Sequence, residues 1–351
     1  MNIFLRVPAQ EKILFAKNLA VMTKAGMPIL DCLRLLQKQV KSKSMKKILN
    51  QFIDDVANGQ FLSASLEKFK NIFGNFAVNI IRVGEASGIL YENLNYLAEE
   101  LTKKQALRRK VLSALIYPAI VVVATVAITG ILIVYVFPKI LPIFKSLKVV
   151  LPLSTRILIA LSEFLFAYGV YVAAGVVMLI IVIGLLIRVR LIRFLTHRFV
   201  LYLPIAGSLS QNYNMANFCR TLGLLLKSDI KVVEAINITA DTLTNLVYKK
   251  ELENLAREIA RGEEISKHLE EKPRLFPSML TQLIAIGETT GNLSETLLYL
   301  SGFYEEKFEE ATKNMSTVLE PLMMLIMGAI VGFIAISIIT PIYEITQGLK
   351  Q

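Results

Sequence analysis

Three long stretches without a charged side chain constrain the fold more than any other feature of this sequence. They cover residues 111–137, 164–187 and 321–343, and each is almost wholly apolar. A helix needs about 20 apolar residues to cross a hydrocarbon core of about 30 Å, so each stretch is long enough to span a membrane. Only 19% of the 351 residues are charged, and the mean hydropathy is +0.54. The sequence therefore predicts an integral membrane protein with three transmembrane helices.

Cations beside these stretches predict the orientation. Lys and Arg cluster just before the first stretch and just after the second, and cytoplasmic flanks carry an excess of such residues. The loop between the two spans also carries cations, but the other clusters are denser and lie closer to the spans. No removed signal peptide is expected, because the first thirty residues lack an apolar core followed by a small-residue cleavage site. The predicted order is a cytoplasmic segment at 1–110, a span at 111–137, an external loop at 138–163, a span at 164–187, a second cytoplasmic segment at 188–313, a span within 314–343 and an external tail at 344–351.

The cytoplasmic segment is duplicated. RVGEASGILYENLNYL at residues 82–97 returns as AIGETTGNLSETLLYL at 285–300, and the same offset of 203 residues maps Phe15 onto Phe218. The offset continues without insertion or deletion into the first and third spans. Each copy is much longer than a solenoid repeat of 20–50 residues, so each is expected to form a domain. The unmatched second span returns the chain to the cytoplasm between the copies.

Each copy is predicted to be a small antiparallel helical bundle. Phe15, Leu19 and Met22 recur at helical spacing, and long alternating Val, Ile and Thr runs are missing outside the apolar stretches. The predicted fold class is therefore all-α: two duplicated cytoplasmic helical bundles and three transmembrane helices.

A GE-x-x-G phrase marks both copies. Its two glycines are expected to bracket a tight connection between helices, because glycine adopts left-handed backbone angles at little cost. Its glutamate is expected near the N-terminus of the following helix, where the helix dipole favours a carboxylate. The recurring positions are Gly84, Glu85, Gly88 and Leu90 in the first copy and Gly287, Glu288, Gly291 and Leu293 in the second.

Two interpretations of these glutamates remain open. Glu85 with Glu92, and Glu288 with Glu295, could contribute to a divalent-cation site, although oxygen-only sites usually need six or more ligands. The favoured alternative is an internal ion pair in each copy, Lys17 with Glu85 and Arg220 with Glu288. No metal or other cofactor is predicted.

The remaining reactive side chains give no ligand pattern. His197 and His268 lack ligand spacing and are expected in solvated or capping roles. Cys32 and Cys219 are isolated, which favours buried free thiols over a disulfide or a zinc site.

These features together resemble the type II secretion system F family, the inner-membrane platform proteins of type II secretion and type IV pilus machines. The resemblance runs from Phe15 to about Pro341, with FAKNLAVMTKAGMPILDCL at 15–33 as a further specific part. Members often begin with an additional N-terminal segment that this chain mostly lacks. In the second copy Ser228-Asp229 replaces Ala25-Gly26, so that turn is expected to be built differently.

The resemblance implies a polytopic scaffold in the bacterial cytoplasmic (inner) membrane. Such a scaffold receives pilins or pseudopilins, couples them to a cytoplasmic hexameric assembly ATPase, and contacts other inner-membrane components of the machine. It leaves open whether the machine builds a pilus, secretes proteins or takes up DNA.

Catalysis is not expected. No G-x-x-x-x-G-K-[ST] loop occurs, so a P-loop nucleotide site is excluded, and two S-x-x-K matches lack their supporting motifs. The alternative function is a membrane transporter subunit, because transporters often contain duplicated halves. However, ion pathways usually need ionisable groups within the membrane, and the three stretches contain none. Solute flux in proteoliposomes distinguishes the two.

Gly328 and Gly332 form a G-x-x-x-G pattern in the third stretch. Small residues four apart allow close helix packing, either against the chain's own spans or in a homo-oligomer. A homo-oligomer is predicted.

The two copies differ in charge. Residues 1–110 carry 18 Lys and Arg against 9 Asp and Glu, whereas residues 188–313 carry 16 against 16. We expect the basic first copy to meet an acidic face of the ATPase, with anionic lipid as the close alternative. Nucleic acid is not expected, because aromatic stacking platforms are not evident. The cations concerned are Lys41, Lys43, Lys46 and Lys47.

Overall fold

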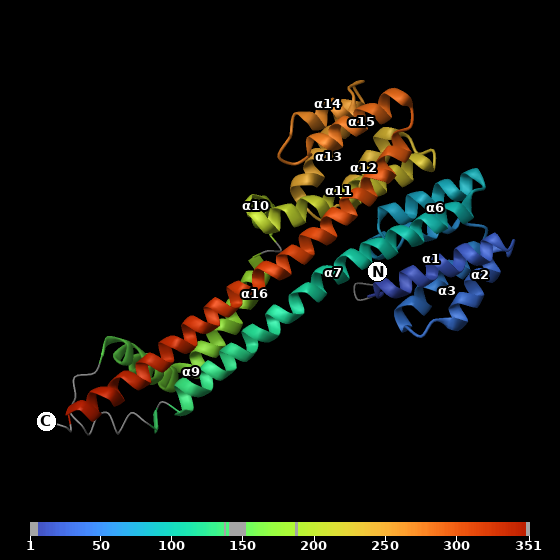
Figure 1. The fold of residues 1–351 in the computed structure, drawn as a ribbon. Helices are drawn as coiled ribbons and strands as arrows, with labels where there is room; N and C mark the ends of the chain where they lie inside the picture. Colours follow the sequence, from blue (N-terminus) through green and yellow to red (C-terminus); the bar gives the residue numbers. More distant parts are fainter. Residues whose placement is uncertain (1–5, 137, 140–151, 187–188, 349–351) are drawn as a thin grey trace. The chain divides into compact units, whose positions relative to one another are not determined.

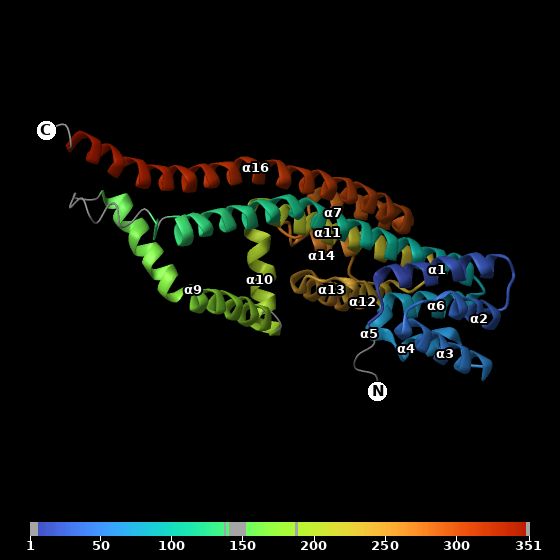
Figure 2. The ribbon, with the colours of Figure 1, turned by 90° about the horizontal axis from the view of Figure 1, so that it is seen from below.

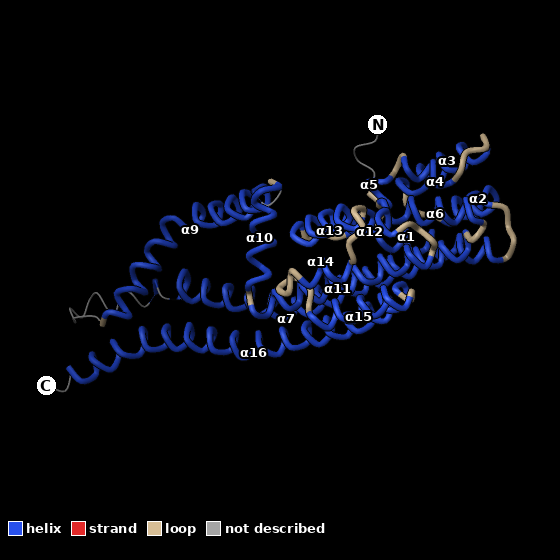
Figure 3. Tube along the Cα trace, turned by 90° about the horizontal axis from the view of Figure 1, so that it is seen from above, coloured by secondary structure: helices blue, strands red, loops and turns tan. Residues whose placement is uncertain are grey.

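The computed structural model describes residues 6–136, 138–139, 152–186 and 189–348. This part of the chain consists of helices and loops without a strand, so the predicted all-α class is confirmed (Figure 3). The chain divides into two compact units. The bundle unit comprises Met1–Lys110 and Phe194–Ala311, and the span unit comprises Val111–Arg193 and Thr312–Gln351.

The first repeat contains seven helices, of which the last continues into the span unit. Prolines precede the first two helices and Ser42 caps the third, where its hydroxyl accepts a hydrogen bond from the backbone N–H of Met45. Phe15, Phe52 and Phe73 pack together at the centre, with ring centroids 5.7–6.0 Å apart. The helices are α1 (Ala9–Lys24), α2 (Ile29–Gln39), α3 (Lys43–Ala57), α4 (Leu62–Glu67), α5 (Lys70–Phe73), α6 (Asn75–Ser87) and α7 (Leu90–Ile131).

The second repeat follows the first nearly residue for residue. The helices that correspond to α1, α2, α3, α4, α6 and α7 are α11 (Pro204–Lys227), α12 (Val232–Thr242), α13 (Leu246–Ile259), α14 (Ile265–Glu270), α15 (Ser278–Thr290) and α16 (Leu293–Gly348). Helix α5 has no helical counterpart, because the equivalent segment begins with Pro273 and forms turns. A further helix, α10 (Arg190–Tyr202), precedes the second repeat.

The expectation that the first turn of the second repeat is built differently from that of the first repeat is wrong. Gly26 and Asp229 both adopt left-handed angles, with φ of +77° and +59°. The same backbone hydrogen bonds close both turns, from the Met27 N–H to the Met22 carbonyl and from the Ile230 N–H to the Leu225 carbonyl. Aspartate tolerates this region better than most residues, so the turn survives the loss of glycine.

The two repeats share one hydrophobic core. A single cluster of buried residues includes Leu19 and Leu97 from the first repeat and Leu222 and Leu300 from the second. Helix α6 packs against α12, and the ion pairs Lys103–Glu305 and Lys110–Glu309 join α7 to α16, two long helices seen in Figures 1 and 2. The repeats therefore form one body rather than two separate bundles.

The span unit contains the predicted transmembrane helices. Among the described residues, three helical segments are long and apolar enough to cross a membrane: Leu90–Val136, which includes the π-helical turn η1 (Leu132–Val136), Leu153–Val172 and Leu293–Pro341. A fourth candidate exists only if the bent pair Ala174–Leu186 and Leu191–Tyr202 forms one span. The prediction of three spans is confirmed.

The helices extend beyond the predicted spans. Helices α7 and α16 begin in the bundle unit and continue through Lys110 and Ala311 without a break. Helix α9 (Leu153–Leu186) begins within the stretch expected to be a loop. Hydropathy marks the apolar part of a helix, but no helix-breaking sequence marks its border.

Candidate functional site

The GE-x-x-G phrase ends one helix and begins the next. Gly88 terminates α6 and Gly291 terminates α15, each with a left-handed backbone, at φ of +73° and +74°. The expected left-handed glycine is therefore present at the second glycine of each phrase. The leucines that follow, Leu90 and Leu293, begin α7 and α16.

The first glycine of each phrase has another role from the one expected. Gly84 and Gly287 lie inside helices, where the next helix approaches their backbone. A Cβ on Gly84 would lie 3.0 Å from the Cα of Leu90, and one on Gly287 would lie 2.9 Å from the Thr296 Oγ1. These glycines allow close helix packing and do not bracket the turn.

The two equivalent glutamates cap helices that lie earlier in the chain. Glu85 accepts hydrogen bonds from the backbone N–H groups of Leu62 and Ser63, at 2.6 and 3.0 Å. Glu288 does the same for Ile265 and Ser266, at 2.7 and 2.9 Å. Neither α4 nor α14 has a capping side chain of its own at its N-terminus. Each glutamate thus satisfies donors that a helix end leaves unpaired.

The predicted ion pairs of these glutamates are wrong. Lys17 is exposed and forms no ion pair with Glu85, and Arg220 binds other carboxylates than Glu288. Both oxygens of each glutamate already accept backbone hydrogen bonds from α4 or α14, not from the following helix. Within the described residues no group of three or more His, Cys, Asp and Glu side chains has the arrangement of a metal site.

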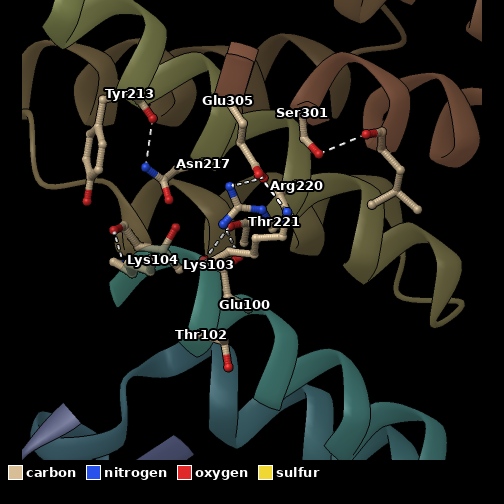
Figure 4. A network of polar contacts seen from close by, with 12 residues as sticks. Glu100, Thr102, Lys103, Lys104, Tyr213, Asn217, Arg220, Thr221, Ser301 and Glu305 are labelled. Carbon is tan, nitrogen blue, oxygen red and sulfur yellow. Dashed lines mark hydrogen bonds and ion pairs between the residues drawn. The ribbon is translucent and has the colours of Figure 1, made fainter. Parts of the chain in front are cut away.

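Arg220 lies at the centre of a buried ion cluster that joins the repeats (Figure 4). Its Nη1 lies 3.4 Å from Glu100 Oε2 on α7, and its Nη2 lies 2.7 Å from Glu305 Oε1 on α16. The side chains of Arg220 and Glu100 are only 3% and 4% exposed. Lys103 extends the cluster by approaching Glu305 Oε2 at 2.8 Å. One guanidinium therefore holds the final helices of both repeats.

Sequence patterns do not predict roles for Glu100, Lys103 and Glu305, because the cluster does not follow the repeat. At the offset of 203 residues, Glu100 corresponds to Phe303 and Glu305 to Thr102. A buried arginine demands buried acidic partners, but the sequence does not show that Arg220 is buried while its counterpart Lys17 is exposed. The sequence signal for this cluster is a set of charged residues in one repeat whose counterparts in the other repeat are uncharged.

Neighbouring polar groups reinforce the contact between the repeats. Ser228, the residue that replaces Ala25, donates a 3.0 Å hydrogen bond to the Asn93 side chain on α7. Asn75 on α6 donates to Asp241 on α12. Each of these two pairs joins one repeat to the other, and both members of the Ser228–Asn93 pair are fully buried.

The cluster also affects a nearby phenol. Burial raises the pKa of Tyr213, and the negative charge of Glu100 raises it further. Tyr213 packs against Phe308 of α16, with ring centroids 5.7 Å apart. This environment disfavours any charge beyond those already paired.

A second buried carboxylate belongs to the first repeat alone. Asp55 accepts hydrogen bonds from Ser65 and Lys68, at 2.5 and 2.8 Å, and from Gln51. Burial opposes its ionisation, but these hydrogen bonds outweigh burial and hold the pKa of Asp55 below its usual value.

The two histidines take local polar roles. His197 Nδ1 accepts a 3.0 Å hydrogen bond from the Leu246 N–H and so caps α13, as expected for a capping histidine. His268 Nε2 lies 3.2 Å from Glu251. Cys32 and Cys219 are buried free thiols, as predicted.

Comparison with known proteins agrees with the duplication. The family described as type II secretion system (T2SS), protein F, matches the chain twice, over residues 15–138 and 218–341. The chain belongs to the type II secretion system F family. The two matched ranges correspond to the two repeats found in the sequence.

Named relatives come from both kinds of machine. The chain is 35% identical to a type IV pilus assembly protein PilC from Thermus thermophilus, over 98% of this chain and 86% of that protein. It is 31% identical to a type II secretion system protein F from Vibrio cholerae, over 96% and 83%, and 28% identical to a PilC protein from Pseudomonas aeruginosa, over 97% and 91%. The family consists of membrane platform proteins of pilus and secretion systems that are not enzymes. The three apolar helices found among the described residues, together with membership of this family, make this chain a multi-pass inner-membrane protein.

In this family member, the predicted basic patch lies on the first repeat around the start of α3. Its members, Lys41, Lys43, Lys46 and Lys47, are all exposed. In the second repeat Lys249 corresponds to Lys46, and there it pairs with Asp241 at 2.6 Å. At this pair of equivalent positions the repeats keep the lysine, but only the second repeat pairs it with a carboxylate.

The span unit is held by polar as well as apolar contacts. Thr155 of α9 donates to the Ser337 carbonyl of α16, at 2.8 Å, and Ser162 donates to the Ile133 carbonyl, at 2.7 Å. Gly328 and Gly332 take no part in such packing, because a Cβ at either would meet no atom within 4 Å. Packing of these glycines against the chain's own described spans, one of the two expectations, is therefore wrong.

Proposed function

We propose that this protein is the platform that couples a cytoplasmic assembly ATPase to the insertion of pilin-like subunits into a growing filament. The observation that carries the proposal is the union of the two repeats by the Arg220 cluster, at the point where α7 and α16 leave the bundle unit as continuous helices. A scaffold of this kind can receive a displacement on its bundle unit and transmit it along two helices at once.

The contacts between α7 and α16 support joint movement. Lys103 pairs with Glu305, and Lys110 pairs with Glu309 one to two turns closer to the apolar segments. Glu100 and Glu305 are further linked through Arg220. Because an uncompensated buried charge is costly, the helices are expected to move together rather than separate at this point.

The orientation places the bundle unit in the cytoplasm, with the N-terminus inside and the C-terminus outside. Dense cations precede the first apolar stretch, at Lys103, Lys104, Arg108, Arg109 and Lys110, which supports a cytoplasmic flank. A single cysteine introduced at Gln351 should react with a membrane-impermeant maleimide applied from outside. Labelling only after membrane disruption would contradict this orientation.

The ATPase contact is assigned to the basic patch of the first repeat, defined above. Among the described residues, no ion pair involves Lys41, Lys43 or Lys46, and the patch lies on the repeat with excess positive charge. An acidic surface of the ATPase fits this charge, and anionic lipid is the alternative. Such a contact should weaken with salt, since the Debye length falls from about 10 Å at 0.1 M to about 3 Å at 1 M.

The patch is tested in the full chain in nanodiscs. The variant Lys41→Glu/Lys43→Glu/Lys46→Glu/Lys47→Glu should lose ATPase binding, whereas Lys249→Glu/Lys250→Glu at the equivalent surface of the second repeat should retain it. Binding to anionic liposomes is measured separately. Undiminished ATPase binding by the fourfold variant, with loss of liposome binding, would reassign the patch to lipid.

The proposed function is tested in the host. Deletion of the gene should abolish filament assembly or secretion while pilin-like subunits accumulate in the membrane, and the wild-type gene should restore it. Filaments or secretion at wild-type levels in the deletion strain would refute the platform role. Purified chain in nanodiscs should also stimulate ATP hydrolysis by the cognate ATPase; unchanged hydrolysis would argue against coupling.

A further inference from the structure

Helix α10 leads into the second repeat and exposes several large apolar side chains. It lies outside both family-matched ranges, and only residues 187–189 separate it from α9. Leu191, Leu195, Phe199 and Tyr202 are 55–70% exposed. At 100° per residue these four positions fall on one face of the helix, so α10 presents a continuous apolar stripe.

The opposite side of α10 holds it to the second repeat. His197 caps α13 through the Leu246 N–H, the Lys250 ammonium lies 5.8 Å from the centroid of the Phe194 ring, and Leu201 packs on the hydrophobic core. These contacts fix the rotation of the helix about its axis. The apolar stripe therefore remains outside the bundle core.

Cations without acidic partners flank the stripe. Arg198 first, and then Arg274, lower the pKa of the exposed Tyr202 phenol through hydrogen bonding and positive charge. Both arginines are exposed, and among the described ion pairs neither binds a carboxylate. The chain contains no Asp or Glu between Glu163 and Asp229. Two like charges that converge on one hydroxyl are stabilised by an anion placed between them.

We propose that α10 docks in the interfacial layer of the membrane, with its apolar stripe among acyl chains and the Arg198–Tyr202–Arg274 cluster on the phosphate of an anionic phospholipid. A helix with an apolar face, arginines at its border and low overall hydrophobicity is typical of interfacial binding. The stripe selects lipid over free phosphate, because a soluble anion would leave these apolar side chains in water. Only residues 187–189 separate α10 from Ala174–Leu186, the apolar second half of α9, so the start of α10 follows directly after a segment that a membrane can hold. The assignment is independent of the proposed coupling to an ATPase.

The test uses the full chain in nanodiscs and a single tryptophan, since the sequence contains none. Phe199→Trp reports on the stripe, and Phe61→Trp is the matched control, because these phenylalanines are 65% and 66% exposed. Phe199→Trp should emit at shorter wavelength and be quenched by phospholipids brominated near the headgroup. Phe61→Trp should be quenched by aqueous acrylamide instead. The docking proposal is wrong if the emission and quenching of Phe199→Trp match those of Phe61→Trp. It is also wrong if the emission of Phe199→Trp is shifted but brominated lipid does not quench it, because a protein partner would then cover the stripe.

The headgroup contact is tested in the Phe199→Trp background. Quenching by brominated phosphatidylglycerol relative to brominated phosphatidylcholine gives the preference for anionic lipid at α10. Arg198→Gln/Arg274→Gln should lower this preference roughly fivefold for each arginine removed. Arg257→Gln/Arg261→Gln, which removes the same charge from the end of α13 and the turn after it, should leave it unchanged. An equal loss in both variants, or none in either, would refute the assigned site; competition by millimolar soluble phosphate would indicate a free-anion site instead.

Discussion

Replacement of Arg220 by methionine should destabilise the bundle unit strongly. The substitution leaves Glu100, only 4% exposed, without its cation, and leaves Glu305 with Lys103 alone. Removal of one partner from a buried ion pair typically costs about 3–5 kcal/mol. For a unit of roughly 150–250 residues, this corresponds to a fall in Tm of roughly 6–20 °C.

Two buried cysteines allow the effect to be located. Cys219 adjoins Arg220 in the sequence and Cys32 lies in the first repeat, and both are fully buried. Burial raises the pKa of the Cys219 thiol, so this residue reacts only when the structure opens. In the purified full chain, Arg220→Met should accelerate maleimide labelling of Cys219 about a hundredfold or more, because each 1.4 kcal/mol changes an equilibrium about tenfold.

The duplication supplies the control. Lys17→Met changes the equivalent position of the first repeat, where the side chain is exposed, and should alter stability by less than about 0.5 kcal/mol. A double variant, Arg220→Met/Glu100→Leu, should recover much of the loss, since apolar replacement of a buried pair is often tolerated. The reasoning is refuted if Arg220→Met matches Lys17→Met in both Tm and Cys219 labelling.

Three further predictions concern other parts of the molecule. Glu85→Gln and Glu288→Gln should each lower the free energy of unfolding by about 1–2 kcal/mol, as for other lost helix caps, and the loss should be equal in the two repeats. Chemical denaturation of the full chain measures this free energy, and an unchanged value would contradict the capping role. Ionised Asp55, with its lowered pKa, stabilises the fold above about pH 4 and loses this effect as the pH falls through the lowered pKa. Asp55→Asn should therefore have a lower Tm at neutral pH, and its Tm should fall less steeply with acid than that of the wild type. An unchanged dependence of Tm on acid pH would contradict this role of Asp55. Gly328→Leu/Gly332→Leu should reduce the mass of the detergent-solubilised oligomer seen by light scattering, because a Cβ at either glycine would meet no described atom of the same chain within 4 Å. An unchanged mass would exclude them from an oligomer contact.

What the sequence predicts well is local. The three apolar stretches identify transmembrane candidates because a membrane imposes both length and composition. Gly88 and Gly291 are predictable at helix ends because the left-handed conformation depends on the residue itself. The duplication is visible because the offset is constant.

The site depends on contacts that no local pattern contains. The GE-x-x-G phrase draws attention to Glu85, but the partners of this glutamate lie 22–23 residues earlier, on a helix that has no cap of its own. Analogy between the repeats predicts a pair of Arg220 with Glu288, yet its partner Glu100 lies 120 residues away, in the other repeat. The analogy failed because the repeats pack against each other, so equivalent positions need not have equivalent surroundings.

The central claim is that the two repeats act as one body during assembly. Asn75 and Asp241 join α6 to α12 across the repeats, so Asn75→Cys/Asp241→Cys in a background without the native cysteines should be linked by a short bifunctional maleimide in living cells. Filament assembly or secretion should continue at the wild-type rate once the repeats are linked. Loss of assembly on linking, when either single cysteine treated in the same way remains active, would mean that the repeats must separate, and would contradict the account.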